Sequence, residues 1–231
     1  MVEERALYLW AGLYSMNNPI IDNIRKSLGR TAQISSTQGA PLSLRPAIYE
    51  SRHPESLDSE IERFLVEIKK LSGVGERLTP ADIDSSLKTL VTEQNIRTAT
   101  VWNTPHLQEL QIANNLLSLD VELVSPTADK HEMAQCDLGI TEADFLLPET
   151  GTIVLTSSAE KPRGVSLLPR VHLAIVSPEM LRADMHQVFA KAKDENYLLF
   201  ITGASRTADI ELTTTLGVHG PKSLYVWMVS E

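Results

Sequence analysis

Apolar residues recur at helical spacing in two segments of the first third of the chain. Residues 30–55, between these segments, contain three prolines and many serines and threonines, which predicts an extended or flexible connector. We therefore expect two parts, an N-terminal helix and connector over 1–55 and a globular domain over 56–231. The apolar positions of the first helix, which begins at Pro19 and ends at Gly29, are Ile20, Ile21, Ile24 and Leu28. Those of the second, over 57–72, are Leu57, Ile61, Phe64, Leu65, Ile68 and Leu71.

Beyond residue 72, short β-rich runs alternate with helices that begin at a proline. Thr79-Pro80, Thr104-Pro105 and Ser177-Pro178 each combine a hydroxyl that can cap a helix with a proline that fits its first turn. This alternation is typical of crossover connections and predicts an α/β fold with a mostly parallel open sheet and helices on both faces. The predicted strands are 98–102, 119–124, 137–140, 152–156, 171–176, 197–202 and 224–229, and the predicted helices include 80–94, 179–193 and 207–216.

Residues 145–156, FLLPETGTIVLT, interrupt the alternation. Two apolar runs flank the turn-forming PETG, which predicts a hairpin with Gly151 in its turn. A hairpin added to a parallel sheet places polar residues beside apolar strands, so this segment is a candidate for function as well as for structure.

Charge and cysteine content narrow the partners. The net charge of −9 argues against a general binder of nucleic-acid backbones, which needs a basic face. Cys136 is the one cysteine, so this chain cannot by itself hold an iron–sulfur cluster, which takes about four thiolates. The six histidines show no ligand-like spacing, and we predict no metal site.

The beginning of the chain does not predict a membrane span. An apolar run from Ala6 to Tyr14 is far shorter than the ~20 residues that cross a bilayer, and Glu3 and Glu4 before it are unlike a signal peptide. We expect a cytoplasmic protein whose translation starts at Met1 or at Met16. The sequence leaves open whether the protein forms homo-oligomers.

One candidate loop is FITGASRTADIE, in which a predicted strand gives way to a predicted helix. Gly203 allows a tight turn, Ser205 or Thr207 can begin the helix, and Arg206 can bind a carboxylate or phosphate in bidentate fashion. The same residues also read as an ordinary helix cap. His219, in the Gly-flanked turn GVHGPK, is either a hydrogen-bonding loop residue or an acid–base group.

The second candidate loop is EADFLLPETGT, from Glu142 to Thr152. Glu142, Asp144 and Glu149 can serve as general bases or metal ligands if they converge, and they can equally be solvated turn residues. Thr141 precedes this loop, and the turn after Glu149 offers hydroxyl and N–H groups to a ligand. The turn residues are Thr150, Gly151 and Thr152. Lys161 and Arg163 follow in the next loop, as anion contacts or as incidental surface charges.

Three runs in fixed order carry a resemblance to a known family: DLGITEADFLLPETGTIVL, RGVSLLPRVHLAIV and ITGASRTADIELTTTLGVHGPKSLYVWMV. Over residues 95–231 they closely resemble the LUD-domain lactate-utilisation family, in particular its short LutC/YkgG-like branch. The chain departs from the family pattern at Ala204, where proline is common, and at Pro148, where a small residue is common.

The resemblance implies a fold related to ribose-5-phosphate isomerase, glucosamine-6-phosphate deaminase and the CoA-transferases. In the sugar-phosphate isomerases of that group, a G-A-D run shortly before a G-T turn carries an acidic catalytic residue. Ala143-Asp144 and Gly151-Thr152 are similar to that arrangement, although Glu142 stands in place of the first glycine.

The resemblance also implies a role in oxidising L-lactate to pyruvate beside two partner proteins, at least one of which bears iron–sulfur clusters. We predict a pocket for a small anionic metabolite at the carboxyl ends of the strands, with Asp144 or Glu149 handling a proton and Arg206 holding the anion. Its ligand-binding residues are Thr141, Thr150, Gly151, Thr152, Gly203, Ser205, Arg206, Thr207 and His219. Two alternatives stay open: a non-catalytic scaffold or regulatory subunit, and a stand-alone isomerase or transferase acting on a phosphorylated or CoA-linked substrate.

Overall fold

A computed structural model describes residues 26–27, 52–195, 197–208 and 214–230. The predicted connector, apart from residues 52–55, and most of the predicted N-terminal helix lie outside this part, and so does the centre of the helix predicted over 207–216. The segment Tyr49–Glu231 forms one compact unit. No helix among the described residues is long and apolar enough to cross a membrane.

Six parallel strands form the main sheet, in the order β1–β11–β7–β4–β2–β3. Val171 of the central strand β7 lies opposite Ser223 on one side and Leu138 on the other, which fixes the register at the middle of the sheet. The predicted parallel sheet is therefore confirmed. Its strands are β1 (Val74–Leu78), β2 (Thr98–Val101), β3 (Glu122–Val124), β4 (Leu138–Thr141), β7 (Val171–Val176) and β11 (Ser223–Val229).

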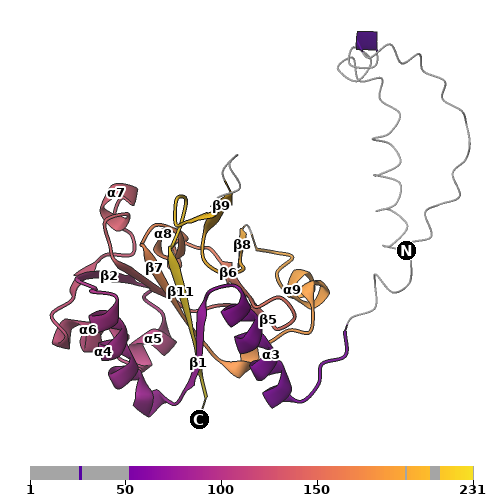
Figure 1. Cartoon of the computed structure of the whole chain (residues 1–231), viewed down its shortest axis with the longest axis horizontal. Helices are drawn as coiled ribbons and strands as arrows, with labels where there is room; N and C mark the ends of the chain where they lie inside the picture. Colours follow the sequence, from indigo (N-terminus) through magenta and orange to yellow (C-terminus); the bar gives the residue numbers. More distant parts are fainter. Residues whose placement is uncertain (1–25, 28–51, 196, 209–213, 231) are drawn as a thin grey trace, which may run out of the picture. The chain divides into compact units, whose positions relative to one another are not determined.

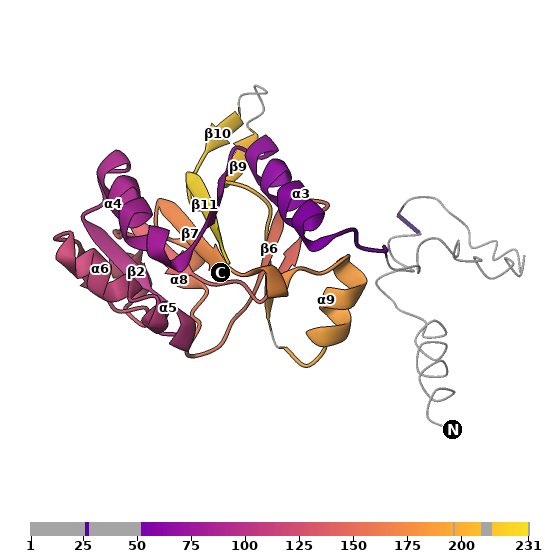
Figure 2. The same ribbon diagram turned by 90° about the horizontal axis from the view of Figure 1, so that it is seen from below.

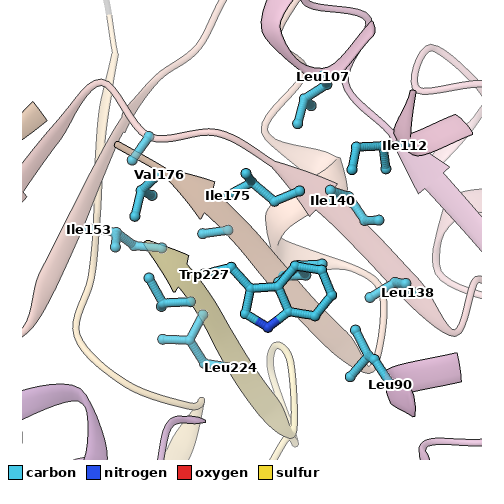
Figure 3. Packing of buried hydrophobic residues seen from close by; sticks show 14 of the residues in the cluster. Leu90, Leu107, Ile112, Leu138, Ile140, Ile153, Ile175, Val176, Leu224 and Trp227 are labelled. Carbon is cyan, nitrogen blue, oxygen red and sulfur yellow. The ribbon is translucent and has the colours of Figure 1, made fainter. Parts of the chain in front are cut away.

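Three helices cover one face of this sheet: α4 (Ile83–Glu93), α5 (Pro105–Glu109) and α6 (Ile112–Ser118). Figure 3 shows Leu90 of α4 beside Leu138 and Trp227, and Leu107 and Ile112 beside Ile140. All of these side chains are buried, with exposed fractions of 3% or less. Alternate residues of the central strands therefore build the core against these helices, as the period of two in a strand requires.

The opposite face is covered by α3 (Leu57–Lys70), α8 (Gly164–Leu167) and a smaller antiparallel sheet, as Figures 1 and 2 both show. The close approach depends on two glycines. A Cβ atom at Gly139 would lie 1.9 Å from the carbonyl oxygen of Val165, and one at Gly75 would lie 3.0 Å from Leu65 Cδ2. Helices on both faces are therefore confirmed.

The smaller sheet contains β5 (Phe145–Leu147), β6 (Thr152–Thr156) and β8 (Leu198–Ile201). β5 and β6 are antiparallel and joined by a turn in which Gly151 has a φ of 58°, so the predicted hairpin is confirmed. The remaining elements are η3 (Pro80–Asp82), α7 (Lys130–Met133), η4 (Pro178–Met180), α9 (Met185–Lys191), β9 (Arg206–Ala208) and β10 (Thr214–Leu216).

Two predicted helices need correction. The helix predicted over 179–193 is a short 3-10 turn at Pro178 followed by α9, which begins at Met185 after the N-cap Asp184. The helix predicted over 207–216 is wrong at both of its ends, because Arg206–Ala208 and Thr214–Leu216 pair as an antiparallel ribbon. The threonines of this segment favour extended backbone over helix.

Candidate functional site

Asp144 lies just beyond the carboxyl end of β4, where it begins the hairpin. Its backbone N–H donates to Val154 O at 2.8 Å. Its carboxylate accepts hydrogen bonds from the N–H of Thr156 at 2.7 Å and from the Thr156 hydroxyl at 3.0 Å, and its other oxygen lies 2.8 Å from Lys161 Nζ. Both carboxylate oxygens are therefore engaged, and Asp144 is held in one orientation.

Lys161 is positioned from two sides. Besides Asp144, its ammonium group lies 5.7 Å from the centre of the Trp102 ring, within the range of a cation–π contact. Trp102 is fixed in turn, because its indole N–H donates to Pro162 O at 3.0 Å. The side chains of Lys161 and Asp144 keep 28% and 20% of their surface exposed, so water or a small molecule can reach the pair.

A cleft of about 910 Å³ lies next to this pair, at the carboxyl ends of β2 and β3. In an open α/β sheet this is where ligands bind, outside the ends of the parallel strands. The cleft is lined by Trp102 and by polar side chains that include Asn103 and Gln108. Among the described lining residues, Glu160 is the one with a formal charge. The cleft therefore suits a largely uncharged body, with Lys161 as the nearby cation.

Glu142 contrasts with Asp144 two positions further along the chain. It is 9% exposed, yet its carboxylate makes no hydrogen bond or ion pair with any other described residue. Its carboxylate oxygens nevertheless reach solvent, so they are free to contact a ligand. Glu142 is one of the three acids of the predicted loop but is not among the residues of the predicted pocket. Its burial, which the sequence could not reveal, makes it a candidate.

The predicted turn residues form a second group. Thr150 and Thr152 share a hydrogen bond between their hydroxyls at 2.7 Å, and Thr152 is linked to the Thr202 hydroxyl at 2.8 Å. Gly151 presses against α3, where a Cβ atom would lie 2.8 Å from the backbone of Glu67 and Ile68.

Glu149, in the same turn, is exposed and lies near Arg52. The pKa of Arg52 is raised above its ordinary value chiefly by a hydrogen bond to Glu60, with a smaller contribution from the charge of Glu149. Nothing in these contacts joins Glu149 to Asp144, so the two predicted acids are not brought together by a shared partner among the described residues.

Arg206 lies elsewhere again. It donates to Leu71 O, and its second contact is Ser72 Oγ at 3.5 Å, so it sits where the chain is about to enter β1. Asp144 follows the opposite, carboxyl, end of β4. β1 and β4 belong to one parallel sheet, so Arg206 lies at the amino ends of its strands and Asp144 at their carboxyl ends. In Figure 1, β9 lies at the upper end of the sheet and the C-terminus at which β11 ends lies at the lower end.

The predicted single pocket with Arg206 and Asp144 is thereby corrected. Arg206 and Thr207 belong to strand β9 rather than to a helix start, so no helix N-terminus assists anion binding there. Thr207 lies opposite Thr215 of β10. The direction of β8 explains the separation. It begins beside Thr156, near Asp144, and runs antiparallel to β6, so the residues after it lie away from Asp144.

Gly203, Ser205 and His219 do come together. They line a smaller cavity of about 200 Å³, whose wall also includes His172. His172 is 1% exposed, and burial lowers its pKa to about 3, so its imidazole is neutral near pH 7. Its Nε2 lies 2.9 Å from the hydroxyl of Thr141, another predicted ligand residue. The predicted ligand residues thus divide among this cavity, the hairpin turn and strand β9.

Cysteine and metal chemistry find little support in the described residues. Cys136 is buried, and burial raises the pKa of its thiol, with a further contribution from the charge of Asp137. Within the described part of the chain, no group of three or more His, Cys, Asp or Glu side chains is arranged to hold a metal ion.

Comparisons with known proteins converge on one family. A family profile described as LUD domain matches residues 62–229. The protein from Shouchella clausii called Lactate utilization protein C is 30% identical over 222 residues, which cover 89% of this chain and 94% of that protein. The protein of the same name from Halalkalibacterium halodurans is 28% identical over 212 residues, 87% of this chain and 92% of that protein.

A solved structure matches the fold. The crystal structure of a DUF162 family protein from Deinococcus radiodurans superposes with a TM-score of 0.59, at 19% identity, over 77% of this chain and 100% of that chain. At this level of identity the likeness concerns the fold alone. It agrees with the α/β architecture described above.

Proposed function

This chain belongs to the LUD domain family, and we propose that it acts in L-lactate utilisation, as a component of the oxidation of L-lactate to pyruvate. The observation that carries the proposal is the match along almost the whole of a relative called Lactate utilization protein C, 94% of whose length is covered. A match of that extent includes both polar loops and the main sheet, so it is not limited to a shared core.

The single cysteine supports a division of labour with partner proteins. Oxidation of a hydroxy acid removes two electrons, which need an acceptor. Cys136 is buried, and no second thiol exists in this chain to help hold an iron–sulfur cluster. We propose that iron–sulfur partner proteins carry the electrons and that this chain contributes binding or positioning.

Within the chain, we assign the metabolite to the region around Lys161 and Asp144. Lys161 is a half-buried cation at the carboxyl ends of the strands, next to the larger cleft. A carboxylate entering there can take the ammonium group from Asp144, since both are acceptors for the same donor. Asp144, which contacts Lys161, is then the acid in position to accept a proton from the metabolite, and Glu142 lies two residues before it in the chain.

A scaffold or regulatory role is the second candidate, favoured by one observation. Asp144 has both oxygens engaged and its cation already paired, which suits a structural acid at least as well as a catalytic one. A stand-alone isomerase or transferase on a phosphorylated or CoA-linked substrate is not favoured, because the described lining of the cleft includes no lysine or arginine.

Deletion of the gene and complementation test the pathway. We expect the deletion strain to lose growth on L-lactate while it still grows on pyruvate, and the full-length gene to restore growth. Equal growth of the deletion strain on both carbon sources would contradict the proposal.

Purification of the tagged chain from lactate-grown cells separates the two candidate roles. Lactate oxidation that requires both this chain and co-purified iron–sulfur proteins, and that is lost with Lys161→Met at unchanged partner binding, supports the metabolite-binding role. Activity that survives Lys161→Met but needs the chain for partner assembly supports the scaffold.

A further inference from the structure

The cavity near the amino-terminal ends of β7 and β11 is separate from the Asp144–Lys161 region. Its floor is the second residue of each strand, His172 and Leu224. Its rim is made by the loops on either side of the β9–β10 ribbon, which are tied together because the backbone of Ser205 donates to Pro221 O at 3.0 Å and accepts from the N–H of Gly217 at 2.9 Å. In Figure 1 this ribbon lies at the upper end of the sheet.

Three polar groups face this cavity without a partner among the described residues. Nδ1 of His172 is buried and makes no hydrogen bond, although its Nε2 is paired with Thr141. The side chains of Ser205 and His219, which line the rim, also lack a hydrogen bond to any described residue. Buried polar atoms are normally satisfied by protein, water or ligand, so the unpaired Nδ1 of His172 indicates an occupant. The half-buried Ser205 and the exposed His219 offer that occupant further donors at the rim.

Most of the remaining lining is apolar, apart from Ser166 and Thr202, whose hydroxyls are hydrogen-bonded within the protein. Leu199, Ile201 and Leu224 form a hydrocarbon wall opposite the polar groups. The volume of about 200 Å³ is several times the roughly 30 Å³ share of one water molecule, so the cavity has room for a small organic molecule. The described lining contains no lysine or arginine, which disfavours a dianion such as phosphate.

We propose that this cavity binds a short-chain monocarboxylate, with its carboxylate on Ser205 and His219, one of its oxygens on Nδ1 of His172, and its carbon chain against the apolar wall. A carboxylate accepts several hydrogen bonds, and all three protein groups can donate one. Thr141 acts as a positioning residue, because a hydroxyl donating to Nε2 selects the tautomer of His172 that carries its proton on Nδ1. The site goes beyond the lactate pathway assignment and does not depend on it.

The test is a titration of the full-length chain with propionate, followed by the imidazole nitrogen resonances in nitrogen-15 NMR spectra and by calorimetry. We expect the His172 nitrogens to shift on saturation and the His219 nitrogens to shift with the same midpoint. Inorganic phosphate and propionamide, matched in size but different in charge, should bind at least about tenfold more weakly, the factor expected for the loss of about one good hydrogen bond.

Variants locate the ligand. Ser205→Leu, which fills the mouth, should abolish binding, and His219→Ala should weaken it about tenfold. His186→Ala, on α9 and outside the cavity lining, is the matched histidine control and should leave binding unchanged. Thr141→Val should change the His172 tautomer in the free protein and weaken binding, whereas Thr141→Ser should restore both.

Three results would overturn the proposal: propionate binding that is equal in the wild type and in Ser205→Leu, propionamide binding as tightly as propionate, or unmoved His172 resonances at saturating propionate. The last of these would mean that ordered water alone occupies the cavity. The deletion experiment on lactate growth does not depend on any of these three results. Failure of one proposal therefore leaves the other open to its own test.

Discussion

The two ends of the main sheet handle polar groups in opposite ways. At the carboxyl end of β4, Asp144 and Lys161 neutralise each other at 2.8 Å and are surrounded by further hydrogen bonds. Towards the amino end of β7, His172 is neutral, buried and half satisfied, and the side chains of Ser205 and His219 near it have no hydrogen bond to any described residue. A paired charge must exchange its partner to bind a ligand, whereas an unpaired neutral group is ready to bind one.

The two ends of the sheet should contribute differently to the stability of the fold. The paired end contributes to stability in the absence of a ligand, because charge-assisted hydrogen bonds hold the hairpin to its neighbouring loop. The unpaired end costs stability until it is occupied, because an unsatisfied buried nitrogen has lost its water. Substitutions at the two ends should therefore affect folding and binding in different proportions.

The largest expected effect on folding is that of Asp144→Ala. The change leaves the ammonium group of Lys161 half buried without a carboxylate and removes the acceptor for Thr156, which should lower the free energy of unfolding by about 3 kcal/mol. Urea denaturation measures it. Glu160→Ala, an exposed acid in the adjacent loop, is the control and should change little. A loss below about 1 kcal/mol for Asp144→Ala would mean that the pair contributes little to the fold.

His172 should make stability depend on pH. Its folded pKa, about 3, lies below the ordinary value of 6.5, so between these values the unfolded chain binds a proton that the folded chain excludes. Stability therefore falls as pH drops below 6.5, by about 2 kcal/mol between pH 6.5 and pH 5 from this residue alone. Chemical denaturation of wild type and His172→Gln at both values isolates the contribution. Parallel losses in the two proteins would show that His172 is protonated in the folded state.

Thr141→Val should have a smaller effect, about 1 kcal/mol, because it removes one hydrogen bond and leaves Nε2 of His172 unsatisfied while it keeps the shape of the side chain. Thermal unfolding of the variant beside Thr141→Ser gives the comparison. An unfolding temperature of Thr141→Val equal to that of the wild type would indicate that water replaces the hydroxyl, and hence that water reaches this wall of the cavity.

Sequence reasoning predicted the fold because its signals are local. The apolar stripe from Leu57 to Leu71 predicts α3, and the PETG turn between two apolar runs predicts the β5–β6 hairpin. β1 escaped prediction because VGERL is short and lacks the alternation of a half-buried strand, and it lies at the edge of the sheet. Its place is set by pairing with β11, which is remote in sequence.

The candidate site was less predictable, for a physical reason. Asp144 and Arg206 both follow short apolar runs. In a purely parallel sheet the loops after such runs would meet at the carboxyl ends of the strands. β8, however, belongs to the smaller antiparallel sheet. It starts beside Thr156 and runs opposite to β6, so the residues that follow it, including Arg206, lie at the other end of the main sheet. The ion pair of Lys161 with Asp144 and the burial of Glu142 and His172 likewise depend on tertiary packing, which the residue types alone do not encode.

The most direct test of the account compares one cation from each end of the sheet by growth on L-lactate at matched protein levels. Lys161→Met should slow or abolish growth, because the proposed metabolite site lies beside Lys161 at the carboxyl end of the sheet. Arg206→Ala should grow like the wild type, because Arg206 contacts the backbone before β1 at the other end. Normal growth of Lys161→Met together with loss of growth in Arg206→Ala would contradict the account.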